Sequence, residues 1–200
     1  MNRSRPFFGP SALLTPANGL TFARLVGAPV LAVMTIDIGP VSWLLWALWT
    51  LFCLSDSLDG YIARQHGTTR SGAFLDPLAD KFLVLGALSA LSAQGVVGIL
   101  PVAIIGAREI AMSAFRVTAG RQGISVPARP LAKLKTLAQD IAIAGAFFPP
   151  IGQSHRGAVA VALWVAVALT LATGFEYFLD ARRDLRNRVA QSAVTSSQGA

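Results

Sequence analysis

The sequence predicts an all-α protein that crosses a membrane several times. Of its 200 residues, 54% are hydrophobic and only 14% are charged, and the mean hydropathy is +0.56. A soluble domain of this length cannot bury so much apolar surface in one core, so the surplus must face lipid. Long apolar stretches recur along most of the chain, separated by short segments with glycine, proline and charge. One polytopic membrane domain is therefore predicted, without a separate soluble domain.

Six apolar segments are long enough to cross a hydrocarbon core of about 30 Å as helices. They cover residues 20–38, 41–58, 75–93, 96–115, 131–149 and 158–178. Three regions follow from them: a cytoplasmic N-terminal segment (1–19) with room for an interfacial helix, a six-helix transmembrane domain (20–178), and a cytoplasmic, partly disordered tail (179–200).

The basic residues of the connectors predict the orientation of these helices. With six spans, the cations of both termini and of the connectors after the second and fourth spans fall on one side, and only Arg156 falls on the other. By the positive-inside rule that side is the cytoplasm, and we expect a multi-pass protein of the cytoplasmic membrane. The net charge of +7 does not indicate a nucleic-acid partner, because the cations are dispersed rather than gathered on one surface.

Four aspartates lie at the cytoplasmic ends of the second and third spans. Asp56 and Asp59 are three residues apart, and Asp76 and Asp80 are four apart, so each pair projects from one helix face. A carboxylate near lipid is costly and is usually functional. The short connector makes the two helices antiparallel neighbours, so we expect the four carboxylates to come together.

Such a cluster needs cations to neutralise it. Hard oxygen ligands favour Mg²⁺ or Mn²⁺ over zinc, because neither His66 nor Cys53 has a partner at zinc-ligand spacing. The alternative is that Arg64, Lys81 and Arg108 satisfy the carboxylates without a metal.

The glycines between the aspartates favour a binding role. Gly60 follows Asp59, and Ala63 is small, which leaves a helix surface where a nucleotide could approach the backbone closely. Gly72 could do the same on the facing helix, and the planar fork of Arg64 suits a phosphate. Glycines in membrane helices also serve helix packing, but their register with the aspartates favours the nucleotide.

Together these residues resemble the signature of the CDP-alcohol phosphotransferase family. The pattern is Asp56-x2-Asp59-Gly60-x2-Ala63-Arg64-x7-Gly72-x3-Asp76-x3-Asp80. The resemblance implies a six-helix membrane enzyme with that family's fold, often dimeric, which transfers a substituted phosphate from a CDP-linked donor to an alcohol.

The resemblance also implies residue roles. It makes Asp56, Asp59 and Asp76 ligands of divalent metal, with two ions of Mg²⁺ or Mn²⁺, while Asp80 both touches metal and is the general base on the acceptor hydroxyl. The residues expected at the cytidine diphosphate are Gly60, Ala63, Arg64, Thr69 and Gly72, with Asn18 and Thr21 from the head of the first span.

The acceptor must be read from the second half of the chain. Ala107-Arg108-Glu109-Ile110, then Ser113, Arg116 and Lys133-Leu134-Lys135-Thr136, resemble the phosphatidylglycerophosphate synthase branch, and so does Asn18-x2-Thr21-x2-Arg24. An acceptor such as sn-glycerol 3-phosphate carries a dianionic phosphate that needs cations. The candidates are Arg108, Arg116, Lys133 and Lys135. Alternatively, these cations only set the orientation of the protein in the membrane, or, in the case of Arg108, form a structural ion pair with Glu109.

We therefore expect phosphatidyl transfer from CDP-diacylglycerol to sn-glycerol 3-phosphate, giving phosphatidylglycerophosphate and CMP. Other readings stay open: inositol phosphate as the acceptor, phosphatidylglycerol as in the cardiolipin synthase of the family, or a cation transporter. A transporter is disfavoured because the aspartates cluster towards one membrane face and no inverted repeat is apparent.

Overall fold

The computed structural model describes the backbone of residues 16–66, 70–121 and 130–176. Within these ranges it also describes the side chains, except those of residues 16–18, 56–66, 70–76, 116, 119–121 and 130. The described chain is all-helical and contains no strand.

Six long helices and one short helix make up this part of the chain. In order they are α1 (Pro16–Asp37), α2 (Trp43–His66), α3 (Arg70–Ala93), α4 (Ile99–Arg121), α5 (Pro130–Phe147), the short α6 (Pro149–Gly152) and a last helix, Arg156–Glu176. Each of the six predicted apolar segments therefore lies largely within one long helix.

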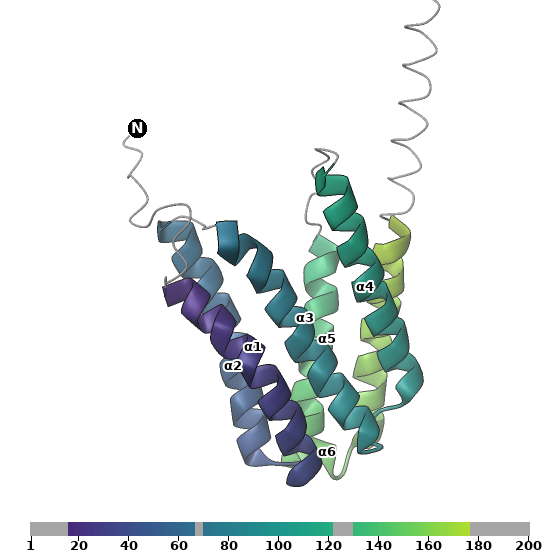
Figure 1. Cartoon of the computed structure of the whole chain (residues 1–200). Helices are drawn as coiled ribbons and strands as arrows, with labels where there is room; N and C mark the ends of the chain where they lie inside the picture. Colours follow the sequence, from purple (N-terminus) through teal and green to yellow (C-terminus); the bar gives the residue numbers. More distant parts are fainter. Residues whose placement is uncertain (1–15, 67–69, 122–129, 177–200) are drawn as a thin grey trace, which may run out of the picture.

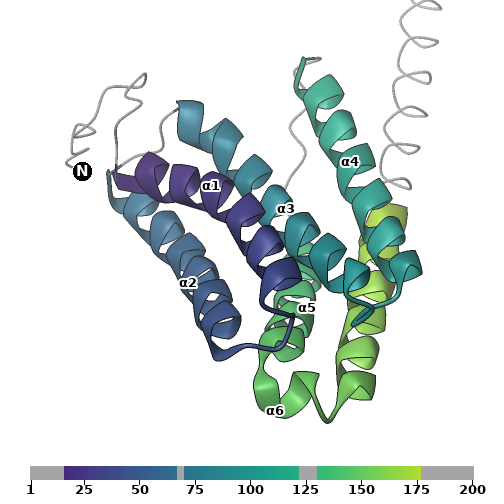
Figure 2. The ribbon, with the colours of Figure 1, turned by 60° about the horizontal axis from the view of Figure 1, so that its bottom comes forward.

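The helices form an up-and-down bundle (Figure 1). α1 and α2 lie on one side, α4 and the last helix on the other, and α3 and α5 between them; α1 packs against both α2 and α3. The turns between α1 and α2 and between α3 and α4 close one end together with α6, as Figure 2 also shows. At the opposite end α3 and α4 diverge, and there α2 ends and α3 begins.

Glycines shape two turns of the closed end. Gly39 and Gly95 have positive φ angles of 86° and 67°, a conformation that other residues adopt only with strain. Gly95 ends α3: its N–H donates to the carbonyl of Ser92, and the N–H of Val96 donates to that of Leu91, both at 3.0 Å. This is the Schellman arrangement, and the side chains of Val96 and Leu91 are both buried in the core.

Large apolar side chains fill the bundle interior. Trp49, Leu88, Ile105, Phe147 and Leu163, from five different helices, are all at most 1% exposed. The indole Nε1 of Trp49 also donates to the carbonyl of Asp140 at 3.2 Å. An N–H buried among apolar groups needs such an acceptor, so this bond ties α2 to α5.

The structure differs from the sequence-based boundaries at two places. α2 continues through the aspartate motif to His66 and α3 begins at Arg70, so the connector is only residues 67–69; Arg64 and Gly72 are helical. The segment predicted to run through Pro149 is broken: α5 ends at Phe147, and Pro149 begins α6. Proline has no N–H to continue a helix but fits its first turn.

Much of the outward surface is apolar. Val26, Val30 and Val33 on α1 are each at least 50% exposed, as are Val161 and Val165 on the last helix. Two described helices are long and apolar enough to cross a membrane by length and composition, Gly19–Asp37 and Arg156–Glu176. The apolar part of α2, Trp43–Ser55, is shorter.

Candidate functional site

The aspartate motif lies on two consecutive helices. Asp56 and Asp59 lie in the last part of α2, and Asp76 and Asp80 in the first part of α3. Because only residues 67–69 separate the helices, the facing helix ends are at most roughly 14 Å apart. The side chains of Asp56, Asp59 and Asp76 lie outside the described residues, as do those of Asn18, Gly60, Ala63, Arg64 and Gly72 and all of Thr69.

Asp80 is the motif aspartate whose side chain the structure describes. Its Oδ1 accepts an ion-paired hydrogen bond from Nη1 of Arg24 on α1. The Arg24 side chain is 1% exposed, whereas that of Asp80 is 39% exposed. A buried guanidinium needs such a counter-charge. Thr21, one turn before Arg24, is also buried, so both lie on the face of α1 that is turned into the bundle.

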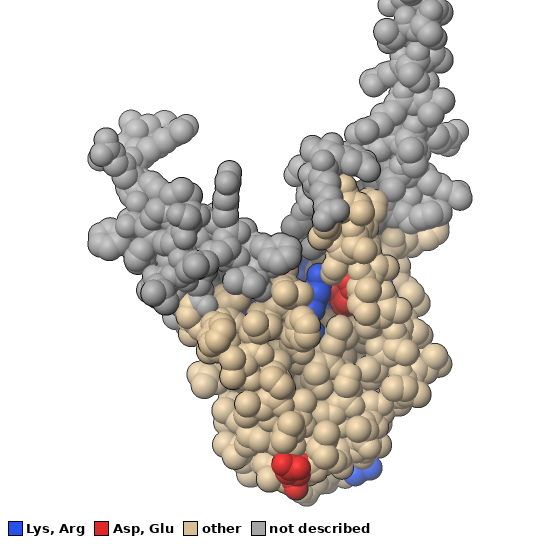
Figure 3. Space-filling model, viewed as in Figure 1, with Lys and Arg blue, Asp and Glu red and all other residues tan. Residues whose placement is uncertain are grey.

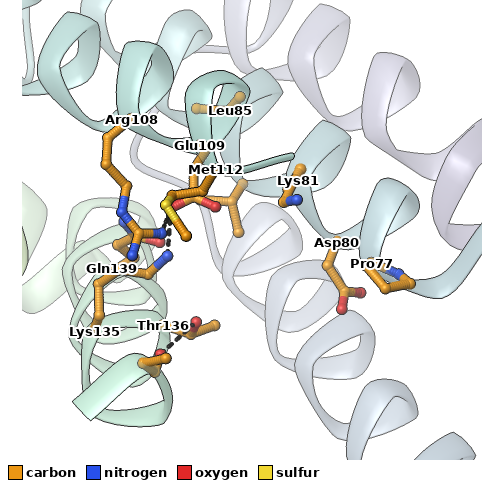
Figure 4. Close-up of a pocket in the computed structure, with 12 residues that line it drawn as sticks. Pro77, Asp80, Lys81, Leu85, Arg108, Glu109, Met112, Lys135, Thr136 and Gln139 are labelled. Atoms are coloured by element: carbon orange, nitrogen blue, oxygen red, sulfur yellow. Dashed lines mark hydrogen bonds and ion pairs between the residues drawn. The ribbon is translucent and has the colours of Figure 1, made fainter. Parts of the chain in front are cut away.

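A polar cavity of about 200 Å³ lies between α3, α4 and α5. Five of its lining residues are charged: Lys81, Arg108 and Lys135 carry positive charge, and Asp80 and Glu109 carry negative charge. Figure 4 shows Asp80 and Lys81 on one wall, with Arg108, Glu109 and Lys135 converging from the other side. In the space-filling view, Lys or Arg and Asp or Glu atoms meet in a hollow of an otherwise largely uncharged surface (Figure 3).

Glu109 is the shared anion of this cavity. Its Oε1 accepts a hydrogen bond from Nη1 of Arg108 at 3.0 Å and another from Nζ of Lys135 on α5. All three side chains are at least 88% buried. One carboxylate thus faces two buried cations, and Asp80 is already engaged by Arg24. Among the described side chains, the cavity therefore carries a surplus of positive charge, which an anion would neutralise.

Hydroxyl and amide groups extend the network to the last helix. Nη2 of Arg108 donates to Oγ1 of Thr173 at 2.9 Å, and that hydroxyl donates to the carbonyl of Thr170 at 2.9 Å. Nε2 of Gln139 on α5 donates to Oγ1 of Thr170 at 3.4 Å. Thr170, Thr173 and Gln139 are all buried. The cavity wall is thus hydrogen-bonded across α4, α5 and the last helix.

Of the residues predicted to bind the acceptor phosphate, two line the cavity and one lies outside it. Arg108 and Lys135 line the cavity. Lys133 is exposed and is not among the lining residues, because two residues along a helix turn the side chain to another face. Its position does not support a contact in this cavity. The side chain of Arg116 lies outside the described residues.

Lys81 is a cation of the cavity that the sequence reading treated only as a possible partner of the aspartates. It lies next to Asp80 on α3 and donates to Oγ of Ser113 on α4, whose hydroxyl donates to the carbonyl of Glu109 at 2.7 Å. Gln139, Thr170 and Thr173 were also missed. Their signal was available: buried polar residues are rare in apolar spans, and Gln139 lies one turn beyond Lys135.

An apolar groove adjoins the polar cavity. It has a volume of about 770 Å³, runs between α3 and α4, and shares Lys81, Leu85 and Glu109 with the cavity. Phe82 and Ile110 line it and are 55% and 68% exposed. Apolar surface open to the outside thus continues into the charged cavity.

The donor set of the motif fits a hard divalent cation. It supplies carboxylate oxygens from two helices, the ligand type that Mg²⁺ and Mn²⁺ prefer. Among the described side chains, no three histidine, cysteine or acidic residues lie close enough together to hold a metal ion. The side chains of the other three motif aspartates, Asp56, Asp59 and Asp76, are outside the described set.

Comparison with known proteins agrees with this arrangement. The sequence model of the CDP-alcohol phosphatidyltransferase family matches residues 14–172. A protein of Mycobacterium tuberculosis named "Probable phosphatidylglycerophosphate synthase" is 36% identical over 182 residues, covering 88% of this chain and 86% of that protein. Proteins of Rickettsia bellii and Bacillus subtilis, both named CDP-diacylglycerol–glycerol-3-phosphate 3-phosphatidyltransferase, are 36% and 34% identical, each covering 80% of this chain and 92% of the relative. The chain is a membrane protein of the CDP-alcohol phosphatidyltransferase family.

Proposed function

We propose that this chain transfers the phosphatidyl group of CDP-diacylglycerol to sn-glycerol 3-phosphate, producing phosphatidylglycerophosphate and CMP for phospholipid biosynthesis. The observation that carries the proposal is the cavity beside Asp80, in which Arg108 and Lys135 share the single carboxylate of Glu109. A neutral acceptor would not need this surplus charge, whereas a phosphate-bearing acceptor would. The names of the relatives point to the same donor and acceptor.

The reaction joins a lipid to a water-soluble acceptor, and the site offers surface for both. The apolar groove between α3 and α4 meets the charged cavity at Lys81, Leu85 and Glu109. Ordered charges at such a boundary bind an anion more strongly than they would in water, because the surrounding dielectric constant is lower.

The chemistry assigns a role to each part of the site. An acceptor hydroxyl oxygen forms a bond to the phosphatidyl phosphorus, the bond from that phosphorus to the bridging oxygen breaks, and CMP leaves with the bond electrons. Asp80 accepts the hydroxyl proton as general base. The ion pair with Arg24 of α1 fixes the position of Oδ1.

Divalent metal completes the proposal. Asp56, Asp59 and Asp76, with Asp80, would hold Mg²⁺ or Mn²⁺, with two ions expected. When bound, the metal neutralises negative charge on the diphosphate. The cytidine diphosphate would contact Gly60, Ala63, Arg64, Thr69 and Gly72, with Asn18 and Thr21 contributing from α1.

Purified protein tests the function directly. With CDP-diacylglycerol and Mg²⁺ or Mn²⁺, CMP release should be fastest with sn-glycerol 3-phosphate and should stop when EDTA removes the metal. Faster release with inositol phosphate or phosphatidylglycerol would refute the acceptor but keep the family chemistry. The absence of metal-dependent CMP release with every acceptor would favour a transporter.

We further propose six membrane spans, a cytosolic active site and a homodimer. The six long helices and the cytoplasmic bias of connector cations support the topology. In a Cys53→Ala background, a cysteine at position 71 should react with an impermeant maleimide only from the cytoplasmic side, and one at position 154 only from the other. Reaction of both from one side would refute six spans. Light scattering in detergent would give the oligomeric state.

A further inference from the structure

The guanidinium of Arg108 lies between two oxygens of different charge. Nη1 donates to the carboxylate of Glu109, the next residue on α4, and Nη2 donates to the neutral hydroxyl of Thr173 on the last helix. Without the second contact, Arg108 could turn both ends of its fork to Glu109, because arginine and carboxylate pair best in bidentate form. The observed arrangement makes one bond to the carboxylate and one to an uncharged group.

The hydroxyl of Thr173 is oriented for this contact. Its single hydrogen is used in the bond to the carbonyl of Thr170 at 2.9 Å, so the oxygen presents a lone pair to Nη2 of Arg108. Thr173 is fully buried, and the branched side chain of threonine has few rotamers in a helix. The acceptor of the Arg108 hydrogen bond is therefore fixed in both position and direction.

The neighbouring residue leaves room for the arginine. A Cβ atom added to Gly174 would lie 3.9 Å from both Cγ and Nε of Arg108. The Nε atom is buried, and no acceptor among the described residues bonds to it. Among the described residues, two of the five N–H donors of the guanidinium are thus used, and Arg108 also lines the cavity.

We propose that Thr173 is a positioning residue for acceptor binding: by holding Nη2 of Arg108 it prevents a bidentate pair with Glu109 and keeps the arginine charge available to the acceptor phosphate. This inference rests on the proposed function for the identity of the acceptor. It adds a residue of the last helix to a site whose other members lie on α3, α4 and α5.

The test compares Thr173→Val, which keeps the shape but removes the hydroxyl, with Thr173→Ser, which keeps the hydroxyl. Thr173→Val should raise the KM for sn-glycerol 3-phosphate roughly threefold to tenfold. The KM for CDP-diacylglycerol should stay within about twofold, and Thr173→Ser should recover most of the acceptor affinity. Equal effects on both KM values, or no recovery with serine, would refute the positioning role.

Thr35→Val is the matched control. Thr35 is also fully buried, but its hydroxyl donates to the carbonyl of Leu31 on the same helix at 2.7 Å, and Leu31 does not line the cavity, whereas Thr173 accepts from the cavity residue Arg108. This substitution should lower the unfolding temperature about as much as Thr173→Val without changing either KM. If it raises the acceptor KM equally, the effect of Thr173 is general loss of stability.

A second variant covers the case in which Thr173→Val does not fold. Gly174→Leu places a larger side chain against Cγ and Nε of Arg108 and should also raise the acceptor KM, whereas Gly174→Ala, at ordinary contact distance, should change it less than twofold. A normal acceptor KM in Gly174→Leu would contradict the requirement for a fixed arginine.

Titration with inorganic phosphate separates this inference from the proposed function. Wild type and Thr173→Ser should bind phosphate more tightly than Thr173→Val, whichever alcohol is the natural acceptor. If that difference appears but sn-glycerol 3-phosphate is not used, the acceptor assignment fails and the positioning role stands. If wild type and Thr173→Val bind phosphate equally, or neither binds it, the positioning role is refuted.

Discussion

Two buried ion-paired sites in this bundle differ in their charge balance. On α1, the buried Arg24 is paired with the partly exposed Asp80 of α3. Between α4 and α5, Arg108 and Lys135 are both paired with the single carboxylate of Glu109. A buried cation paired with a carboxylate needs no further anion to balance its charge, whereas two cations that share one carboxylate gain from an added anion. The first site is suited to orienting a carboxylate and the second to binding a phosphate.

The largest effect is expected at Asp80. Asp80→Asn should lower kcat about 10³-fold, because the acceptor hydroxyl loses its base, while CDP-diacylglycerol binding persists. The substitution also leaves the buried Arg24 without this counter-charge, so the variant should be less stable.

The double variant Arg24→Met, Asp80→Asn separates the two effects. It should recover stability but not turnover, as measured by thermal unfolding and by CMP release. Loss of donor binding in Asp80→Asn would mean that Asp80 serves mainly as a metal or nucleotide ligand.

The next largest effect is expected at Lys135 and tests the surplus positive charge of the cavity. Lys135→Met removes one of the two cations but leaves Glu109 paired with Arg108. The KM for sn-glycerol 3-phosphate should rise roughly tenfold to a hundredfold, for a loss of about 1.5 to 3 kcal/mol of binding free energy. The KM for CDP-diacylglycerol should change far less. Steady-state kinetics with each substrate varied in turn would measure both, and parallel changes would contradict an acceptor-specific role.

A smaller effect is expected at Glu109, where the substitution should strengthen anion binding instead of weakening it. Glu109→Gln removes the shared anion, so inorganic phosphate should bind a few-fold more tightly because a nearby negative charge is gone. The same change should lower the unfolding temperature, since Arg108 and Lys135 then repel each other without phosphate. Measuring the unfolding temperature with and without phosphate tests both the tighter phosphate binding and the lower stability. A variant as stable as wild type without phosphate would show that the cavity charges are already balanced.

The smallest effect is expected at Lys133, which lies two residues before Lys135 but is exposed outside the cavity. Lys133→Met should change the KM for sn-glycerol 3-phosphate less than twofold. Comparison with Lys135→Met, which removes the same charge from the same helix, isolates the contribution of the cavity. Equal increases in KM would mean that both lysines act through the general positive field at this end of the bundle.

The sequence predicted the long helices well, whereas the roles of the site residues stay predictions. Six long helices follow from apolar segments of sufficient length, and the motif spacing is compatible with helical faces. The boundaries at Pro149 and in the aspartate connector were wrong, because apolar length alone does not show where a helix breaks or continues past the lipid. The carboxylate cluster itself stays a prediction.

The contacts between distant helices could not be predicted. Arg24 was noticed as part of a motif, but its pairing with Asp80 depends on α1 packing against α3. The choice between Lys133 and Lys135 depends on the rotation of α5 about its axis. Both are fixed by tertiary packing, which one sequence does not show. The threonines of the last helix could have been found by searching apolar spans for polar residues.

The pairing of Arg108 with Glu109 has a consequence for biosynthesis. A ribosome delivers residues in order, so Arg108 is inserted before Lys135, which follows Glu109 by 26 positions, and before Thr173, which follows Arg108 by 65. An unpaired arginine in lipid is costly. In the proposed six-span topology, the adjacent glutamate can neutralise the arginine during that interval, so the span formed by α4 would enter the bilayer with these two charges balanced. Once α5 and the last helix are in place, Lys135 bonds to Glu109 and Thr173 bonds to Arg108. A chain that stops before the last helix would lack the Thr173 contact, so Arg108 would pair with Glu109 alone.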